Sequence, residues 1–339
     1  MEYRVAFIEG DGIGPEQAAA TRVLLTKLED TQGIKLNLIS VEAGDRALKD
    51  RGEALSQESF NIIEKSDCCL KGPVGQSAYD VIVRLRRDLD LYANIRPAKP
   101  LPKVPCIAPQ ETDLVIVREN TEDLYCGLES ADEEKAIATR VITRKASQRI
   151  AKHAFELART RKRGVTAIHK SNVLKKTDGL FLLACKEVSE KYPDVQFSNM
   201  LVDAAAMNLI RNPQAFDVLV TTNMFGDILS DEAAQVVGGL GLVPSANVGD
   251  HFALFEPVHG SAPDITGRNI ANPIALILSA AMMLEWLGRE KSDPTASEAS
   301  RIIHEAVEET LRSGEVTRDL GGSLNTAEMG NAIAAHISK

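Results

Sequence analysis

Residues 216–231 read FDVLVTTNMFGDILSD, and this stretch decides the fold class. Its first half is apolar and rich in β-branched residues, which is typical of a buried strand, whereas apolar residues from Ile228 onward recur at helical spacing. The helix places Asp227 and Asp231 four residues apart on one face, where like charges repel. Either a divalent cation with oxygen ligands compensates for this repulsion, or the carboxylates simply suit the positive end of the helix dipole.

Strand-like and helical segments alternate along much of the chain, which predicts an α/β fold. Strands are predicted over residues 4–8, 36–41, 68–71, 114–117, 165–169 and 218–222, and helices over 56–65, 78–91, 147–161 and 177–192. The turn GDGIGP at residues 10–15 is similar to a dinucleotide-binding loop. However, Pro15 stands where the third glycine of G-x-G-x-x-G is required, so the sequence does not predict a Rossmann fold.

At 339 residues, the chain exceeds what one hydrophobic core usually serves. Five of its fourteen prolines lie between Pro97 and Pro109, which predicts a connector or an edge strand at a crossing between two domains. The glycine-rich run 238–241 predicts the return crossing. We therefore expect a large cofactor-binding domain from residues 1–96 and 239–339, and a small inserted domain, with a dimer interface, from residues 97–238.

Composition excludes several classes of protein. A net charge of −9 without a basic face argues against nucleic acid as a partner. No apolar run is long enough to span a membrane, and the first residues lack a signal-peptide profile, so we expect a cytoplasmic protein. The five cysteines have no paired spacing and are expected to be reduced thiols.

Several charged residues follow predicted strands or crowd one helix, as catalytic groups in α/β folds often do. Arg84, Arg86 and Arg87 could grip a substrate with two or three carboxylates, although surface salt bridges are the alternative. Tyr125 could relay a proton or be an ordinary half-buried tyrosine. Lys170 could act as a base if it is removed from water, or remain a solvated lysine at a strand end.

Five long motifs in order along the chain resemble those of the β-decarboxylating dehydrogenases, the isocitrate and isopropylmalate dehydrogenase family. They are GDGIGPE (10–16), DLYANIRP (90–97), RENTE (118–122), GDILSD (226–231) and EPVHGSAPDI (256–265). The resemblance implies two α/β domains that share a large mixed sheet. It also implies oxidation of a 2-hydroxy acid with a 3-carboxylate by NAD or NADP, followed by decarboxylation, with Mg²⁺ or Mn²⁺.

The resemblance also implies roles for particular residues. The substrate would be bound by Arg86, Arg96, Arg118 and Asn172; the acid/base pair would be Tyr125 and Lys170; the metal ligands would be Asp203, Asp227 and Asp231. In the resembling enzymes, the lysine and the first aspartate reach the site from the neighbouring subunit. A homodimer with shared active sites is therefore expected, with a tetramer as the alternative.

The family's cofactor rests on a loop rather than on a Rossmann crossover. The residues implied here are Glu256, His259, Gly260, Ser261, Ala262, Pro263, Asp264 and Asn272. Asp264 favours NAD, because a carboxylate can bind the ribose 2′-hydroxyl and repels a 2′-phosphate. Arg318 is the nearby departure from the family pattern that could weaken this preference.

The substrate's third carbon is expected to contact the helix that ends in Arg86, through Tyr79, Asp80, Ile82 and Val83. Isocitrate enzymes place serine and asparagine at the positions of Asp80 and Ile82, and homoisocitrate enzymes place arginine at Val83. A buried apolar group gains roughly 0.8 kcal/mol per CH₂, whereas an unpaired carboxylate loses several kcal/mol. We therefore expect conversion of 3-isopropylmalate to 4-methyl-2-oxopentanoate and CO₂ in leucine biosynthesis. The alternatives are an isocitrate or homoisocitrate enzyme and a non-catalytic regulatory subunit.

Overall fold

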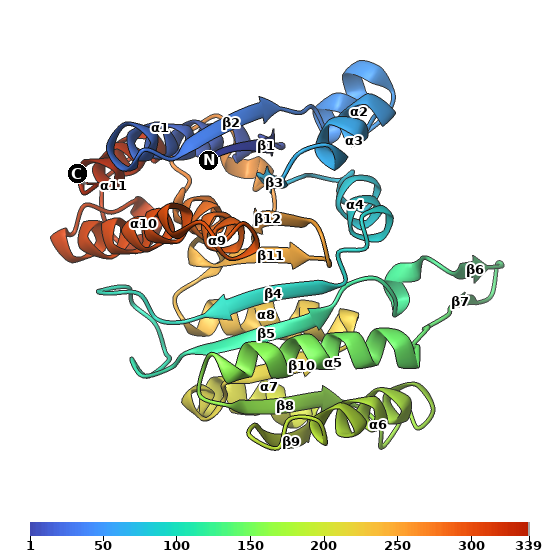
Figure 1. Cartoon of the computed structure of the whole chain (residues 1–339). Coiled ribbons are helices and arrows are strands. Elements are labelled where there is room, and N and C mark those ends of the chain that lie inside the picture. The colour runs from blue at the N-terminus through green and yellow to red at the C-terminus, as the bar shows by residue number, and fades with distance from the viewer. Residues whose placement is uncertain (338–339) are drawn as a thin grey trace.

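The computed structural model describes residues 1–337, in which one ten-stranded mixed sheet runs through the molecule beside a two-stranded hairpin (Figure 1). The strand order is β2-β1-β3-β12-β11-β4-β5-β10-β8-β9. The strands are β1 (Glu2–Ile8), β2 (Lys35–Ser40), β3 (Cys68–Lys71), β4 (Ala93–Ala98), β5 (Leu114–Glu119), β8 (Gly164–His169), β9 (Gln196–Leu201), β10 (Val218–Thr221), β11 (Pro244–Val248) and β12 (Ala253–Pro257). The predicted α/β class and the shared mixed sheet are confirmed.

Helices cover both faces of the sheet. They are α1 (Gly14–Gln32), α2 (Asp45–Arg51), α3 (Gln57–Glu64), α4 (Arg84–Asp88), α5 (Arg144–Arg159), α6 (Thr177–Ser189), α7 (Val202–Arg211), α8 (Asn223–Val236), α9 (Ile274–Glu290), α10 (Pro294–Ser313) and α11 (Thr326–Ala335). The α5 helix begins three residues earlier than predicted because the Thr143 side chain caps it by accepting a hydrogen bond from Ala146 N at 3.2 Å. The run predicted as one helix over 78–91 is instead a π-helical turn, Tyr79–Val83, followed by the short α4.

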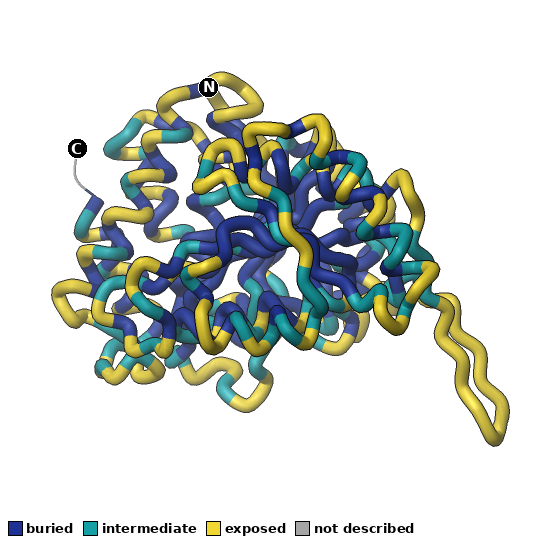
Figure 2. Tube along the Cα trace, turned by 90° about the horizontal axis from the view of Figure 1, so that it is seen from below, coloured by how far each residue is buried: buried dark blue, intermediate teal, exposed yellow. Residues whose placement is uncertain are grey.

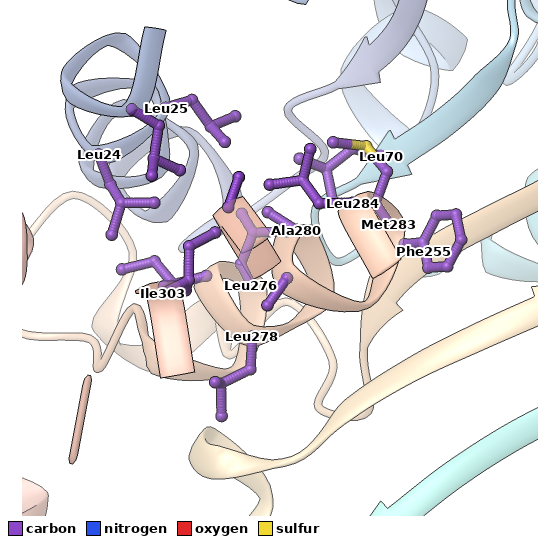
Figure 3. Close-up of a cluster of buried hydrophobic side chains, with 14 of the residues drawn as sticks. Leu24, Leu25, Leu70, Phe255, Leu276, Leu278, Ala280, Met283, Leu284 and Ile303 are labelled. Carbon is purple, nitrogen blue, oxygen red and sulfur yellow. The ribbon is translucent and has the colours of Figure 1, made fainter. Parts of the chain in front are cut away.

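The largest hydrophobic core lies between the sheet and the helices α1, α9, α10 and α11. Nearly every residue of α9 is buried, because the helix lies against β11 and β12 on one side and against α10 and α1 on the other. Figure 3 shows part of this core, with Leu24 and Leu25 from α1, Leu276 and Leu284 from α9, Ile303 from α10 and Phe255 from β12. A separate core packs α5 and α6 against β5, β8 and β10.

The middle of the sheet is antiparallel, whereas its two ends are parallel. β11 runs antiparallel to β12 and to β4, and β4 runs antiparallel to β5. The parallel strands at one end, β2, β1, β3 and β12, therefore run opposite to those at the other end, β5, β10, β8 and β9. The register aligns Asn247, Asn94 and Arg118 in one row across β11, β4 and β5.

The proline-rich connector predicted after residue 96 is only partly correct. Pro97 lies in β4, which has neighbours on both sides and is not an edge strand. A proline is tolerated there because the pairing of β4 with β11 ends at Ile95, so Pro97 pairs only with β5. The glycines of the run expected to form the return crossing lie in the turn after α8, where Gly238 and Gly239 have φ angles of 131° and 129°.

One hairpin projects from the molecule. Its strands β6 (Glu129–Ala131) and β7 (Ala136–Ala138) are exposed throughout, and Figure 2 shows them as a long exposed arm. Leu128 and Ile137 in this arm are 54% and 49% exposed. No feature of the sequence predicts this hairpin.

Candidate active site

Three arginines predicted to bind substrate converge at the middle of the sheet. Arg86 lies on α4, Arg96 on β4 and Arg118 on β5, and all three are buried. Arg96 Nη1 lies 3.4 Å from Asp227 Oδ1, and Arg118 Nη1 forms a close ion pair with the same oxygen. The structure thus brings together residues from three separate elements of the sequence.

The α8 helix can approach Arg118 closely because of Gly226. A Cβ atom at this position would lie only 2.5 Å from Arg118 Cγ. The Arg118 guanidinium also donates from Nε and Nη2 to Asn223 Oδ1, at 2.9 and 2.7 Å. The first turn of α8 therefore holds Arg118, and the following turns carry Asp227 and Asp231.

The arginine cluster keeps one hydrogen-bond donor without a partner inside the protein. Burial and the neighbouring Arg118 together lower the pKa of Arg96 to about 10, although Asp227 opposes this shift. Burial also lowers the pKa of Arg86. Arg96 Nε is buried without a hydrogen-bond partner. Buried cations with a free donor favour binding of an external anion such as a carboxylate.

Asp227 and Asp231 lie on one face of α8, as predicted. Arg96 Nη1 is 3.1 Å from Asp231 Oδ1, and the Tyr125 hydroxyl donates a close hydrogen bond to Asp227 Oδ2. Although burial would raise the pKa of Asp227, Arg118 and Arg96 outweigh this effect and lower it. Burial raises the pKa of Asp231, although Arg96 partly offsets the effect.

Burial raises the pKa of Tyr125, and Arg118 offsets this only in part. The hydroxyl is therefore protonated near neutral pH, which is the form a proton donor requires. Tyr125 lies in a short 3₁₀ turn, Leu124–Cys126, directly after the β5 loop, and its ring lies under the Arg118 guanidinium at 5.0 Å.

The other proposed acid/base residue, Lys170, lies apart from this cluster. Its Nζ is 2.7 Å from Asp203 Oδ1, at the start of α7, and this hydrogen bond lowers the pKa of Asp203. Both side chains are partly exposed, at 28% and 63%. Asn172 is exposed in the turn after Lys170.

The proposed metal ligands lie in two places: Asp227 and Asp231 lie on α8, whereas Asp203 is paired with Lys170. Among residues 1–337, no cluster of three or more histidine, cysteine, aspartate or glutamate side chains could hold a metal ion. The two α8 carboxylates are partly exposed, at 35% and 52%, and they are oxygen donors of the kind that Mg²⁺ and Mn²⁺ prefer. These residues fit a hard cation, whereas Asp203 lies with Lys170 rather than beside them.

The loop predicted to bind the cofactor is braced against the start of α1. Ile13 N donates to Ser261 O at 3.0 Å, and Gln17 Nε2 lies 3.1 Å from His259 Nε2. Burial lowers the pKa of His259, so its neutral ring can donate from Nδ1 to Gly260 O and accept from Gln17. Ala262 has a φ of 42°, in the left-handed region.

The rest of the predicted cofactor residues lie around this loop. Pro263 and Asp264 begin a short 3₁₀ turn and are exposed. Asn272 is buried, and its Nδ2 donates to Asp319 Oδ2 at 3.0 Å, beside the exposed Arg318. The exposed carboxylate of Asp264 remains free to interact with a ligand.

Glu256 has its side chain fully engaged within the protein. Lys71 Nζ is 2.8 Å from Oε2, and Arg86 Nη2 is 3.2 Å from Oε1, which also accepts from Asn247 Nδ2 at 2.8 Å. Although burial opposes ionisation, Lys71 and Arg86 lower the pKa of Glu256 to about 2. The Glu256 carboxylate therefore holds Arg86 in place at the edge of the arginine cluster.

Glu256→Gln is expected to lower the free energy of unfolding by about 3–5 kcal/mol, because it leaves two buried cations without their anion. The wild-type carboxylate stabilises the fold fully above its unfolded-state pKa of 4.5, and this contribution is lost as the pH falls toward about 2. Urea unfolding at several pH values would measure both effects. The surface variant Glu285→Gln is the control, and an equal loss in the two variants would contradict the assignment.

The residues expected to contact the substrate's third carbon do not all share one environment. Ile82 is half-buried against a core beneath α3. Val83 is buried, and with Tyr79 and Asp80 it lines a surface pocket of about 570 Å³ together with Arg84 and Arg87. Arg84 and Arg87 thus lie at this surface pocket, and only Arg86 of the three arginines on this helix joins the arginine cluster.

Sequence reasoning did not identify the polar row beside the arginines. Asn247 Oδ1 accepts from Arg86 Nε, Asn94 Nδ2 and Asn120 Nδ2, at 2.9, 3.0 and 2.9 Å. Asn94 and Asn120 lie in motifs that the sequence singled out, but Asn247 and Lys71 lie outside them. Buried polar residues within apolar strands were the only available signal.

The chain is similar to known dehydrogenases over almost its whole length. Residues 4–333 match the family model described as isocitrate/isopropylmalate dehydrogenase. A 3-isopropylmalate dehydrogenase of Methanothermobacter thermautotrophicus is 51% identical and covers 98% of each chain. A homoisocitrate dehydrogenase of Methanocaldococcus jannaschii is 45% identical, covering 99% of this chain and 98% of its own. The crystal structure of isocitrate dehydrogenase from Methylococcus capsulatus matches with a TM-score of 0.90 and 43% identity, covering 99% of this chain and 100% of that one.

Proposed function

The chain belongs to the isocitrate/isopropylmalate dehydrogenase family, and we propose on this basis that it converts 3-isopropylmalate to 4-methyl-2-oxopentanoate and CO₂ in leucine biosynthesis. It is a decarboxylating dehydrogenase that acts on a small hydroxy acid. The observation that carries the proposal is the buried arginine cluster, with its unpartnered Arg96 Nε, beside two partly exposed carboxylates.

The arginine cluster would bind the carboxylates of the substrate. Arg86, Arg96 and Arg118 are held by neighbouring side chains, so their positions are fixed before the substrate arrives. A prepositioned cluster lowers the entropic cost of orienting the substrate. Asn172, exposed near Lys170, would contribute a further polar contact.

Proton transfers would be carried out by two side chains. Lys170 of a second copy would take the proton of the substrate's hydroxyl group, and Tyr125 would return a proton to the third carbon after CO₂ departs. Asp227 orients the Tyr125 hydroxyl through the hydrogen bond between them. This division between an acid and a base gives each proton transfer its own residue.

Asp227 and Asp231 of one chain, with Asp203 of a second, would hold Mg²⁺ or Mn²⁺. When bound, the metal ion would stabilise negative charge on the substrate oxygens, and NAD would accept the hydride. The loop around His259 would hold NAD, whereas Glu256 would act indirectly by holding Arg86. Asp264 would discriminate against the 2′-phosphate of NADP.

A homodimer would complete the site. Met207 and Ile210 of α7 and Ile228 of α8 are 65%, 59% and 56% exposed, although they are large and apolar. Exposed apolar side chains clustered on two contacting helices are typical of an interface. We assign this interface to the inserted segment 97–238, which also carries the exposed β6–β7 arm, and a pairing of dimers into tetramers is the alternative.

Homoisocitrate is the second candidate substrate, because a relative of that name is 45% identical. The relative named for 3-isopropylmalate is 51% identical, and neither Ile82 nor Val83 offers the polar side chain that a further substrate carboxylate would need.

No helix among residues 1–337 has the length and apolar character to cross a membrane.

NADH production should be at least about 100-fold more efficient, as kcat/KM, with 3-isopropylmalate than with isocitrate or homoisocitrate, because those acids would leave a carboxylate without a partner. The assay would compare the three acids, with NAD and with NADP, in the presence of Mn²⁺. Chelation of the metal should remove activity and added Mn²⁺ should restore it. A preference for either tricarboxylate would overturn the substrate assignment.

A further inference from the structure

A buried charge cluster outside the proposed active site links elements that carry its catalytic groups. Asp123 and Asp178 are fully buried, and Arg140 between them is only 13% exposed. Arg140 Nε lies 2.5 Å from Asp123 Oδ1, and its Nη1 forms a close ion pair with Asp178. The guanidinium also stacks on the Phe225 ring, 4.9 Å from its centre.

The contacts of Asp123 lead to the Tyr125 side of the site. Asp123 Oδ1 accepts from Leu124 N at 2.9 Å, at the start of the turn that carries Tyr125. Its Oδ2 accepts from Met224 N at 3.1 Å, in the first turn of α8. Asp123 itself has a φ of 73°, so its backbone is held in an unfavourable region for a residue other than glycine.

The contacts of Asp178 lead to the Lys170 side. Asp178 Oδ2 accepts from the backbone Lys170 N at 2.5 Å, and this contact fixes the point at which the lysine leaves β8. Arg140 Nη2 donates to Thr222 Oγ1 at 2.7 Å, just before α8 begins. One guanidinium therefore connects the backbone of Lys170 to the elements that carry Tyr125 and Asp227.

Stability alone does not explain such a cluster. Burying charges is costly, and well-packed apolar residues often replace a buried ion pair without loss of stability. The cluster contains two carboxylates and one cation, and each carboxylate also accepts a backbone N–H group from an element of the site. Apolar side chains could not accept these backbone N–H groups. The distinct contribution of the charged cluster is therefore to fix the backbone geometry at the site.

We propose that Arg140, with Asp123 and Asp178, is a positioning residue that sets Lys170 and Tyr125 relative to each other without contacting the substrate. The inference rests on the proposed function. Because Lys170 would act in the site of a second copy and Tyr125 in the site of its own chain, the cluster connects the two active sites of the dimer.

Arg140→Lys tests this role because it keeps the positive charge and loses the planar fork that reaches both carboxylates. We expect kcat to fall about 10- to 100-fold, whereas KM for the acid stays within about threefold, because the arginine cluster is untouched. The solvent deuterium isotope effect on kcat should rise, since misplaced acid and base groups slow proton transfer. The full-length enzyme would be assayed well below the melting temperature of each variant.

The matched control is Arg144→Lys, which alters an exposed arginine paired with Glu187 and should leave kcat unchanged. If Arg140→Lys does not fold, Asp178→Asn tests the inference in its place. Asparagine keeps the shape of the side chain and an oxygen that can accept from Lys170 N, but it removes the negative charge that holds Arg140. Wild-type kcat and isotope effect in the folded variant would overturn the inference. An inactive wild-type enzyme would instead overturn the proposed function.

Discussion

Lys170→Met is expected to lower kcat by a factor of about 100–10,000, the contribution typical of a general base. Methionine replaces the flexible aliphatic part of the side chain but cannot take a proton. Folding should be preserved, because the Lys170–Asp203 ion pair is exposed to solvent and such pairs contribute little to stability. Steady-state turnover and thermal melting would measure the two properties separately.

Lys175→Met is the matched control, because Lys175 is exposed in the same loop and should be dispensable. Retention of wild-type turnover by Lys170→Met would remove Lys170 from the mechanism. A large fall in the melting temperature would show that Lys170 has a structural role instead.

Asp227→Asn is expected to reduce kcat/KM by about 1,000-fold or more, since it removes a proposed ligand of the metal ion and weakens the electrostatic stabilisation that the ion supplies. It also removes the anionic partner of the buried Arg118 and the acceptor that orients Tyr125. Titration calorimetry with Mn²⁺ alone should show weaker binding. Glu232→Gln, on the same helix, is the control, and unchanged Mn²⁺ affinity in Asp227→Asn would contradict the metal assignment.

The two inactive variants can be combined to test whether active sites are shared. A mixed dimer of Lys170→Met and Asp227→Asn chains would contain one site with both residues intact. Random reassociation should then restore about a quarter of wild-type activity, since half of the dimers are mixed and each has one intact site. No recovery in demonstrated mixed dimers would place Lys170 and Asp227 of one chain in the same site.

The sequence predicted those parts of the fold that depend on local patterns. The strand and helix of residues 216–231 were confirmed as β10 and α8, because apolar periodicity and burial agree there. β4 was not predicted, because Pro97 suggests a connector rather than a strand. The proline is tolerated only because the pairing between β4 and β11 ends at Ile95, which the sequence does not reveal. The π-helical turn at Tyr79–Val83 has no recognised pattern in the sequence.

For the candidate site, the sequence predicted the residue types but not their contacts. The resemblance selected Arg86, Arg96 and Arg118, whereas their convergence depends on the register of β4 and β5 and on the packing of α4. The role of Glu256 as an anchor for Arg86 could not be predicted, because its partners lie 170 and 185 residues away along the chain. Their proximity depends on how distant strands are ordered in the sheet.

The unbroken ladder of ten strands limits how this molecule can move. Each of its inner strands is hydrogen-bonded to two neighbours, including those at the middle, where β4 lies between β11 and β5. No flexible tether separates the half that carries the His259 loop from the half that carries Lys170. Any narrowing of the space between them must therefore come from added coiling of the sheet itself, spread over several strand pairs.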